Sequence, residues 1–479
     1  ALMFHQVKGH NIPVVVGAMG SYKMYSVGLE LDPSKPRNEL MGKIREKWIN
    51  ALDNPVEPKI VDTGPCKENI LVGDQIDIHK LPVPVWAPEK DGGSEKGYGF
   101  LTSPYHVTKD PDTGTRNVGT YRNMIRDEPN IMGIAPMHGS HCAIHVKKNE
   151  EKGKDTEIAT VLGADPTIGM VSVAPIPYGV DEFAVAGGLR GAAVELVKCE
   201  TVDLEVPATA EIVIEGKLLN KGRRGWEREG PFGEYTGYEG PDRLGPLFQI
   251  TCITHRHNPI YQGFVSQMPP SESTKVKHMA NESIVLRTLR SLGVEGVVDL
   301  SMPEAGGQGV IIVSIQKQHY GHPRHIAEAV FSVLQPRWGK FVIVTDDDID
   351  IYDLNGVLWA VMFRTAMTPN RKNIQFLEGI CAQVLDYSGT PSIEDARKKE
   401  DWPGVGVFID ATRPYSPYPV TSLPPARYLE KAREEWEKYG LPTLETLDLP
   451  RCVTIEEEYL RKGVSAKPGR QATVQSNVT

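Results

Sequence analysis

Short apolar runs separated by glycine, proline and aspartate clusters fill the first 265 residues of the chain. The runs are rich in β-branched residues, which is typical of strands. Clear examples are residues 13–17, 210–216 and 248–254. The last of these leads through His257-Asn258-Pro259 into another apolar run at 260–265, and this order predicts a hairpin. We therefore expect a β-rich, barrel-like domain here, in which the proline-rich stretch 81–88 is a loop.

The hydrophobic period changes after residue 270. Apolar residues recur at helical spacing from Val276 to Leu292, and Ser271 or Ser273 can cap the start, so this segment is predicted to be a connecting helix. Beyond it, strand-like and helical runs alternate, which is typical of an α/β layer. These runs are residues 309–315, 325–331, 341–344 and 357–362.

The pattern as a whole predicts an α/β (α+β) protein in four parts. They are a β-rich domain, a connecting helix, an α/β domain and a C-terminal part, at residues 1–270, 271–292, 293–425 and 426–479. In the last part a charged helix is expected near residues 428–439. The polar composition of residues 465–479 predicts a flexible tail.

Composition narrows the class of protein. The 479 residues are 40% hydrophobic and 24% charged, as in ordinary soluble domains, and no apolar run reaches the ~18 residues of a membrane helix. The net charge of −9 comes from 53 basic and 62 acidic residues without long like-charge blocks, which argues against nucleic-acid or membrane partners. Six scattered cysteines and no visible secretory leader favour a cytoplasmic protein. The expected partner is a small molecule.

The segment 229–234, Glu-Gly-Pro-Phe-Gly-Glu, is the strongest chemical signal. Two carboxylates bracket a turn whose glycines and proline restrict the backbone, so Glu229 and Glu234 can be held in defined positions. Fixed carboxylates suit acid/base chemistry better than a solvated charge run does. A second polar cluster, from Asn117 to Arg122, lies upstream. Together the two segments indicate an active site.

A divalent-cation site is a weaker hypothesis. Asn117, His141 and Glu182 offer an oxygen, a nitrogen and a carboxylate, a mixed set that suits Mg²⁺ or Mn²⁺. Each also has a structural explanation, as a turn residue, a satisfied polar residue and a surface-loop residue respectively. Because the wide intervals between them follow no ligand-spacing rule, the pattern by itself favours the structural explanations.

Three further motifs are predicted to be structural. The acidic run Asp346–Asp350 follows an apolar strand, where such residues usually form a solvated turn and cap the next element. His255-x-His257 has the spacing of metal ligands but adjoins the predicted hairpin tip, so exposed turn residues are expected. The glycines at 186–191 and 305–309 lack the context of a dinucleotide site, and no GK[ST] sequence is present.

The order of three segments resembles that in UbiD-like decarboxylases: residues 117–122 (Asn-Val-Gly-Thr-Tyr-Arg), 175–182 (Pro-Ile-Pro-Tyr-Gly-Val-Asp-Glu) and 229–234. The resemblance extends from Leu2-Met3-Phe4 to Val357-Leu358-Trp359-Ala360 and so covers nearly the whole chain. It implies that the N-terminal domain is built around a split β-barrel and binds prenylated FMN. It also implies that the C-terminal α/β domain mediates oligomerisation.

The resemblance strengthens the metal hypothesis. It implies that Asn117, His141 and Glu182 hold a Mn²⁺ or Mg²⁺ ion that bridges to the cofactor phosphate, accompanied by K⁺. A phosphate near carboxylates needs cationic neutralisation, and an ion supplies it without a glycine-rich phosphate loop.

Further residues are implied to contact the flavin, namely Thr120, Arg122 and Ser140. The stretch around Ser140 offers two histidines. The family's spacing to Gly153-Lys154 favours His141 as the metal ligand and leaves His138 as a pocket residue.

Arg122, Glu229 and Glu234 match the family's catalytic arginine and two glutamates. The resemblance implies that Arg122 pairs with Glu229 and orients the substrate carboxylate, while Glu234 delivers the proton that replaces CO₂. Decarboxylation at an sp² carbon leaves a carbanion that no standard side chain stabilises. The modified flavin is implied to supply the electron sink through a covalent adduct with the substrate carbon.

The predicted function is therefore a non-oxidative decarboxylation, reversible at high CO₂, of an aromatic, heteroaromatic or α,β-unsaturated carboxylic acid. Analogy favours a mono- or bicyclic aromatic acid. A flavin prenyltransferase is the expected supplier of the cofactor, and a homodimer or homohexamer is the expected assembly. The alternatives are a carboxylase or acyl-CoA-type decarboxylase of the same fold, or a non-catalytic flavin-binding protein.

Overall fold

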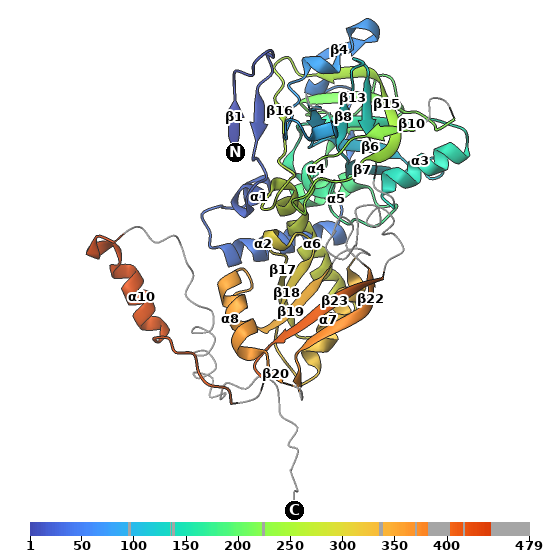
Figure 1. Cartoon of the computed structure of the whole chain (residues 1–479). Helices are drawn as coiled ribbons and strands as arrows, with labels where there is room; N and C mark the ends of the chain where they lie inside the picture. The colour runs from blue at the N-terminus through green and yellow to red at the C-terminus, as the bar shows by residue number, and fades with distance from the viewer. Residues whose placement is uncertain are drawn as a thin grey trace, which may run out of the picture. The chain divides into compact units, whose positions relative to one another are not determined.

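The computed structural model describes residues 1–93, 97–134, 136, 139–222, 226–334, 339–368, 371–381, 403–414 and 417–441. The chain divides into two compact units, Ala1–Ser283 and Ile284–Thr479. The division falls inside α6 (Glu272–Ser291), the helix that occupies the predicted connecting segment. Each unit contains a hydrophobic core of its own, and Figure 1 labels many of their elements. The predicted tail at 465–479 lies outside the described residues.

A large antiparallel sheet forms the centre of the N-terminal unit. Among the described residues it has ten strands, eight of them in the order β5-β8-β9-β15-β13-β10-β6-β7, while β14 and β4 pair with β15. The strands are β4 (Asn69–Val72), β5 (Phe100–Leu101), β6 (Tyr105–Lys109), β7 (Arg116–Thr120), β8 (Asn123–Ile125), β9 (Ile131–Ile134), β10 (Thr156–Leu162), β13 (Ile212–Leu218), β14 (Trp226–Glu229) and β15 (Arg243–His255). Their inward residues, such as Ile158, Ile214 and Phe248, are fully buried and form the core.

Smaller elements surround this sheet. Two three-stranded sheets are β1 (Leu2–Phe4), β2 (Val14–Val16) and β16 (Tyr261–Gln262), and β3 (Lys59–Ile60), β11 (Glu195–Lys198) and β12 (Glu205–Pro207). The helices are α1 (Tyr22–Gly28), α2 (Arg37–Asp53), α3 (His141–Glu151), α4 (Pro166–Val171), α5 (Glu182–Arg190) and the 3₁₀ turns η1 (Pro65–Lys67), η2 (Gly73–Gln75), η3 (Ile78–Lys80) and η4 (Asp91–Gly93). Helix α2 buries residues at helical spacing, from Leu40 and Ile44 to Trp48.

The predicted hairpin at 248–265 is wrong. Strand β16 pairs with β2 in parallel and does not pair with β15. The reason is that β15 has no open edge where the hairpin would form. Ile253 pairs with Ile214 on one side and with Leu71 on the other, so the chain after Pro259 leaves the sheet. His257 is exposed, as expected for a turn residue, but His255 is half-buried and is the last residue of β15, so the prediction is wrong for His255.

The C-terminal unit contains the predicted α/β layer. In the part of this unit that the structure describes, a five-stranded sheet has the order β17-β18-β19-β23-β22, with parallel pairing from β18 to β23 and antiparallel edges. Its elements are β17 (Val297–Ser301), η5 (Glu304–Gly306), β18 (Val310–Ile315), α7 (His322–Val333), β19 (Phe341–Asp346), α8 (Leu354–Arg364), β20 (Met367–Thr368), β21 (Arg371–Lys372), β22 (Ile374–Cys381), β23 (Pro403–Ala411), α10 (Ala426–Glu435) and η7 (Glu437–Tyr439).

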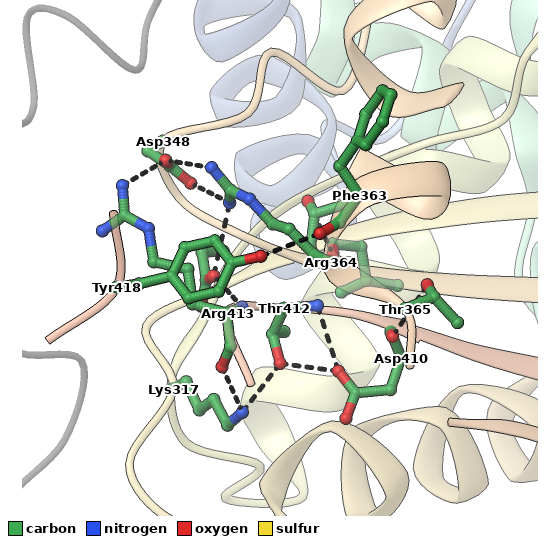
Figure 2. A network of polar contacts seen from close by, with 12 residues as sticks. Lys317, Asp348, Phe363, Arg364, Thr365, Asp410, Thr412, Arg413 and Tyr418 are labelled. Carbon is green, nitrogen blue, oxygen red and sulfur yellow. Dashed lines mark hydrogen bonds and ion pairs between the residues drawn. The ribbon is translucent and has the colours of Figure 1, made fainter. Parts of the chain in front are cut away.

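The acidic run after β19 is structural, but the expectation of a solvated turn is wrong. Asp346 and Asp348 are buried, at 4% and 2% exposure. Asp348 accepts two hydrogen bonds from Arg364, both of 2.7 Å, and one of 2.6 Å from Arg413, as Figure 2 shows. Two arginines that are distant in sequence therefore neutralise the run, which local sequence cannot reveal. Asp353 caps α8 through the backbone N–H of Asn355.

Candidate active site

The three predicted metal ligands come together from three separate elements. Asn117 lies in β7, while His141 and Glu182 are the first residues of α3 and α5. The Nδ1 atom of His141 lies 3.1 Å from Oδ1 of Asn117 and 3.5 Å from Oε1 of Glu182. The helix starts are fixed by their caps, because Ser140 accepts from the backbone N–H of Ala143 and Asp181 accepts from that of Phe183.

This donor set fits a divalent cation. Ligands placed about 2.1 Å from an octahedral ion stand about 3 Å apart, close to the separations found here. Glu182 is buried, and its other carboxylate oxygen accepts the backbone N–H of Val118 at 2.9 Å. Burial raises the pKa of Glu182, so a cation beside it would stabilise the ionised form. In the described residues no cluster of three His, Cys, Asp or Glu side chains is arranged for a metal, and in the predicted set the third ligand would be the amide oxygen of Asn117.

The predicted flavin residues lie next to this cluster. Thr120 ends β7, and its hydroxyl lies 2.8 Å from that of Ser172, beside a small, mainly apolar cavity. The cavity is lined by Met19, Ser103, Tyr105, Thr120, Gly169, Val173, Phe264 and Val276. Ser140 is the N-cap of α3 and so adjoins His141. The alternative ligand His138 lies outside the described residues.

The predicted catalytic residues converge on one guanidinium. Arg122 donates from Nε to Oε1 of Glu229 at 2.7 Å and from Nη2 to Oε2 of Glu229 at 3.0 Å. Its Nη1 donates to Oε1 of Glu234. The Glu229 side chain is 1% exposed and that of Glu234 is 18% exposed. Arg122 is thus a bidentate partner of a buried carboxylate and a single-contact partner of a more accessible one.

Local structure explains how the two glutamates meet Arg122. Glu229 ends β14, and the chain then folds into a narrow loop closed by backbone bonds between Gly240 and Phe232 (2.8 Å) and between Glu234 and Tyr238 (2.9 Å). Phe232 is buried, and its ring centroid lies 4.6 Å from that of Phe100. The buried ring anchors the loop beside Glu234, which begins the turn at the end of the loop.

A glycine is required at position 230 because the backbone of another segment passes close to it, and not because the backbone adopts an unusual angle. A Cβ atom at this position would lie 2.4–2.5 Å from the backbone of Gly92. The two segments are joined by the hydrogen bond from the Gly92 N–H to the Pro231 carbonyl, at 2.8 Å. The missing side chain therefore lets two backbones pack directly against each other.

Two residues near Arg122 and Glu234 were missed by the sequence analysis. Asp91 is fully buried, its Oδ2 accepts the backbone N–H groups of Trp86 and Ala87 at 2.8 Å each, and burial raises its pKa. Lys277, on α6, interacts with the charge of Glu234, and burial lowers its pKa. The Asp-Gly-Gly turn at 91–93 was visible in the sequence, but nothing in it indicated contact with residue 231.

Comparison with known proteins establishes the family. Residues 59–269 match UbiD, the 3-octaprenyl-4-hydroxybenzoate carboxy-lyase Rift-related domain, and residues 278–411 match the corresponding C-terminal domain. An uncharacterised protein of Archaeoglobus fulgidus is 34% identical over 438 residues, which cover 86% of this chain and 87% of that protein. The chain therefore belongs to the UbiD family.

Solved structures of this class are similar over most of the chain. The UbiD-class enzyme HmfF from Pelotomaculum thermopropionicum, in complex with FMN, has a TM-score of 0.76 and 32% identity and covers 88% of both chains. An evolved dimeric form of HmfF with prFMN has a TM-score of 0.73 and 31% identity, covering 89% of this chain and 90% of that one. Vanillic acid decarboxylase of Sedimentibacter hydroxybenzoicus, in open form, has a TM-score of 0.76 and 28% identity, covering 91% and 89%.

These findings confirm three predictions, namely the family, the mixed α/β fold and the enzyme class. The chain is a UbiD-type carboxy-lyase, so the alternative of a non-catalytic flavin-binding protein is set aside. No helix within the described part of the chain has the length and apolar character needed to cross a membrane.

Proposed function

We propose that this enzyme binds prenylated FMN and removes CO₂ from an aromatic, heteroaromatic or α,β-unsaturated carboxylic acid, in a reaction that reverses at high CO₂. The observation that carries the proposal is the Glu229–Arg122–Glu234 arrangement, in which one half-buried cation contacts two carboxylates of different exposure. It supports binding of a carboxylate next to a residue that can donate a proton.

The cofactor assignment has two supports. One is the similarity to HmfF, whose structures contain FMN and prFMN. The other is the convergence of Asn117, His141 and Glu182, which would hold Mn²⁺ or Mg²⁺ close to Thr120 and Ser140. When bound, prenylated FMN supplies an electron sink for the carbon that loses CO₂. K⁺ is the proposed companion ion.

Arg122 is proposed to orient the substrate carboxylate. A guanidinium has five N–H donors, and the bonds to Glu229 and Glu234 use three of them. The two remaining donors make no hydrogen bond to the residues that the structure describes, and we propose that they bind a further carboxylate. Because Glu229 holds the guanidinium by two bonds, its plane is fixed before substrate binds, which reduces the entropy lost on binding.

Glu234 is proposed to donate the proton that replaces CO₂. It has one bond to Arg122 and is more exposed than Glu229, so it can change partner more easily during turnover. The ring centroid of Phe232 lies 5.5 Å from the Arg122 guanidinium carbon and covers one side of the pair. A buried apolar ring at this place limits water access and strengthens the local electrostatic interactions.

The substrate is proposed to be a mono- or bicyclic aromatic acid, in keeping with the vanillic acid decarboxylase to which the chain is similar. A flavin prenyltransferase is the proposed cofactor supplier. The proposed assembly is a homodimer or homohexamer, for which the dimeric form of HmfF is a precedent.

The test is CO₂ release by protein co-expressed with a flavin prenyltransferase, measured over a panel of aromatic, heteroaromatic and acrylic acids. The wild type is expected to decarboxylate at least one acid. Glu234→Gln should retain flavin but lose about 10²–10⁴-fold in kcat, the usual contribution of a proton donor. Glu195→Gln, which removes a carboxylate that is 52% exposed and paired with Lys59, is the control. Equal rates for Glu234→Gln and wild type would contradict the proposed role.

A further inference from the structure

A buried carboxylate ties together three elements near the candidate metal site. Asp110 follows β6 and is 2% exposed. Lys148, on α3, donates to its two oxygens at 3.0 and 2.8 Å. The hydroxyl of Tyr178, in the segment before α5, donates to Asp110 as well. Because α3 begins with His141 and α5 begins with Glu182, Asp110 links the two helices that carry predicted ligands.

The ring of Tyr178 contacts the predicted ligand His141 directly. Their ring centroids are 5.1 Å apart with an interplanar angle of 85°, an edge-to-face contact. The Tyr178 ring also lies 5.9 Å from His145, one turn further along α3. A side chain occupies one of a few staggered rotamers, and an aromatic ring placed edge to face against the imidazole limits which of them it can adopt.

A second chain of contacts aligns the same helix with the strand that carries Asn117. Nδ1 of His145 lies 2.9 Å from the Thr108 hydroxyl, which also accepts a long hydrogen bond of 3.5 Å from Asn117. Thr108 and Asn117 are opposite each other in the β6–β7 pair. The position of α3 is therefore set by contacts of His145 and Lys148, one and two turns beyond His141.

The ammonium group of Lys148 is paired with two carboxylates, those of Asp110 and Asp112. Besides Asp110, Lys148 contacts Asp112 at 3.0 Å, and its ammonium lies 5.5 Å from the Tyr178 ring centroid. The two carboxylates raise the pKa of Lys148 and offset its charge. A lysine paired in this way suits a role in fixing side chains better than a role in binding an anionic ligand.

Building on the proposed function, we propose that Asp110, Tyr178 and Lys148 are positioning residues for the divalent cation. They fix the His141 imidazole with Nδ1 facing Asn117 and Glu182. Groups that orient metal ligands usually change metal affinity by about 10–100-fold when removed. Tyr178 and Asp110 are thus part of the metal site, although neither contributes a ligand atom.

The test compares five variants by Mn²⁺ binding, one of which, Glu182→Gln, removes a predicted ligand. The full chain, purified with its flavin and stripped of metal by a chelator, is titrated with Mn²⁺ and followed by electron paramagnetic resonance. Tyr178→Leu and Asp110→Asn are expected to raise the Kd for Mn²⁺ by about 10–100-fold. Tyr178→Phe keeps the aromatic ring against His141, so it should raise the Kd for Mn²⁺ less than Tyr178→Leu does. Lys59→Met, which removes an exposed pair with Glu195, should bind Mn²⁺ as the wild type does.

The outcomes separate this inference from the proposed function. Melting temperatures measured before metal is added identify any variant that has lost its fold. The comparison of Tyr178→Phe with Tyr178→Leu is decisive, because only the first keeps the aromatic ring against His141. If wild type binds Mn²⁺, Glu182→Gln abolishes binding and Tyr178→Leu matches wild type, the inference is overturned and the proposed function stands. If wild type takes up no Mn²⁺, both are overturned.

Discussion

At the scale of single residues, the site depends on one half-buried cation, Arg122, that stays charged beside a buried carboxylate. Burial by itself would lower the pKa of Arg122, but the charges of Glu234 and Glu229 outweigh it and the pKa is raised. Arg122 is therefore permanently protonated, and its partner Glu229 stays satisfied at 1% exposure. Charge and hydrogen bonding at this pair serve stability and chemistry together.

The two contributions can be separated by a double variant. Arg122→Met leaves Glu229 as a buried carboxylate without its cation, which should destabilise the N-terminal unit by about 3–5 kcal/mol and abolish decarboxylation. Adding Glu229→Gln removes the stranded charge and should recover most of the stability without restoring activity. Thermal unfolding and CO₂ release are the measurements, and recovered activity in the double variant would contradict the role of Arg122.

Two buried histidines give the N-terminal unit a pH dependence. Burial lowers the pKa of His106 and of His145 from 6.5 to about 4. Between these values the unfolded chain binds more protons than the folded chain, so stability rises with pH across this window and is lost as the pH falls through it. Each histidine should contribute about 1.4 kcal/mol per pH unit there.

His106→Gln tests this pH dependence directly. Glutamine does not titrate but can still hydrogen-bond to Asn123, whose Oδ1 lies 2.8 Å from Nε2 of His106. Melting temperatures of variant and wild type are compared at pH 7.5 and pH 5. The variant is expected to lose less stability on acidification, and an identical loss in both proteins would count against the assignment.

At the scale of elements, the loop from Glu229 to Gly240 positions the two glutamates against Arg122. Its geometry depends on backbone contact with the turn at 91–93 and on the buried ring of Phe232. Phe232 belongs to the Glu-Gly-Pro-Phe-Gly-Glu motif, whereas the turn at 91–93 lies outside it. The motif therefore presents the glutamates, but the neighbouring turn fixes where they lie.

Gly230→Ala is predicted to move this loop. The new Cβ would lie 2.4 Å from the Gly92 carbonyl oxygen, so the loop must shift, and Glu234 should lose its alignment with Arg122. A shift of about 1 Å commonly costs on the order of 100-fold in rate, so kcat should fall by this order while flavin is retained. Gly42→Ala, in helix α2 with open space around the site, is the matched control and should be neutral or slightly stabilising.

The hydrophobic pattern along the chain predicted correctly the helices and strands whose formation depends mainly on neighbouring residues. The connecting helix and the alternating strands and helices after it lie where the hydrophobic period placed them. The hairpin failed because both edges of β15 near Ile253 are already paired, which is a long-range property. For the same reason the buried acidic run was misjudged, since its arginine partners lie far along the chain.

The candidate site divides in the same way. The motif at 229–234 and the upstream cluster from Asn117 to Arg122 indicated an active site, and the resemblance strengthened the metal hypothesis for Asn117, His141 and Glu182. The structure brings the members of each set together. Asp91 and Lys277 were missed because their proximity to the site is created by folding.

At the scale of the whole molecule, the predicted site residues and the buried ion pairs of Asp348 lie in different units. All predicted site residues lie in Ala1–Ser283, and the Asp348 network lies in Ile284–Thr479. Each unit contains its own core, so unfolding in two steps is expected rather than a single transition.

Asp348→Asn should act on one of these steps. It weakens the pairing of Arg364 and Arg413 at a site that is 1% exposed, which should cost about 3–5 kcal/mol. Differential scanning calorimetry should show one transition at lower temperature, while the transition that responds to Mn²⁺ and flavin is unchanged. A single cooperative transition, lowered as a whole, would contradict the division.

The measurement that tests the account most directly is the mass of the ligand released by denaturing the full chain after co-expression with a flavin prenyltransferase, with metal analysis of the same sample. The account predicts prenylated FMN together with Mn²⁺ or Mg²⁺, and reduced metal in Glu182→Gln. A protein that releases no flavin and contains no divalent metal would contradict it.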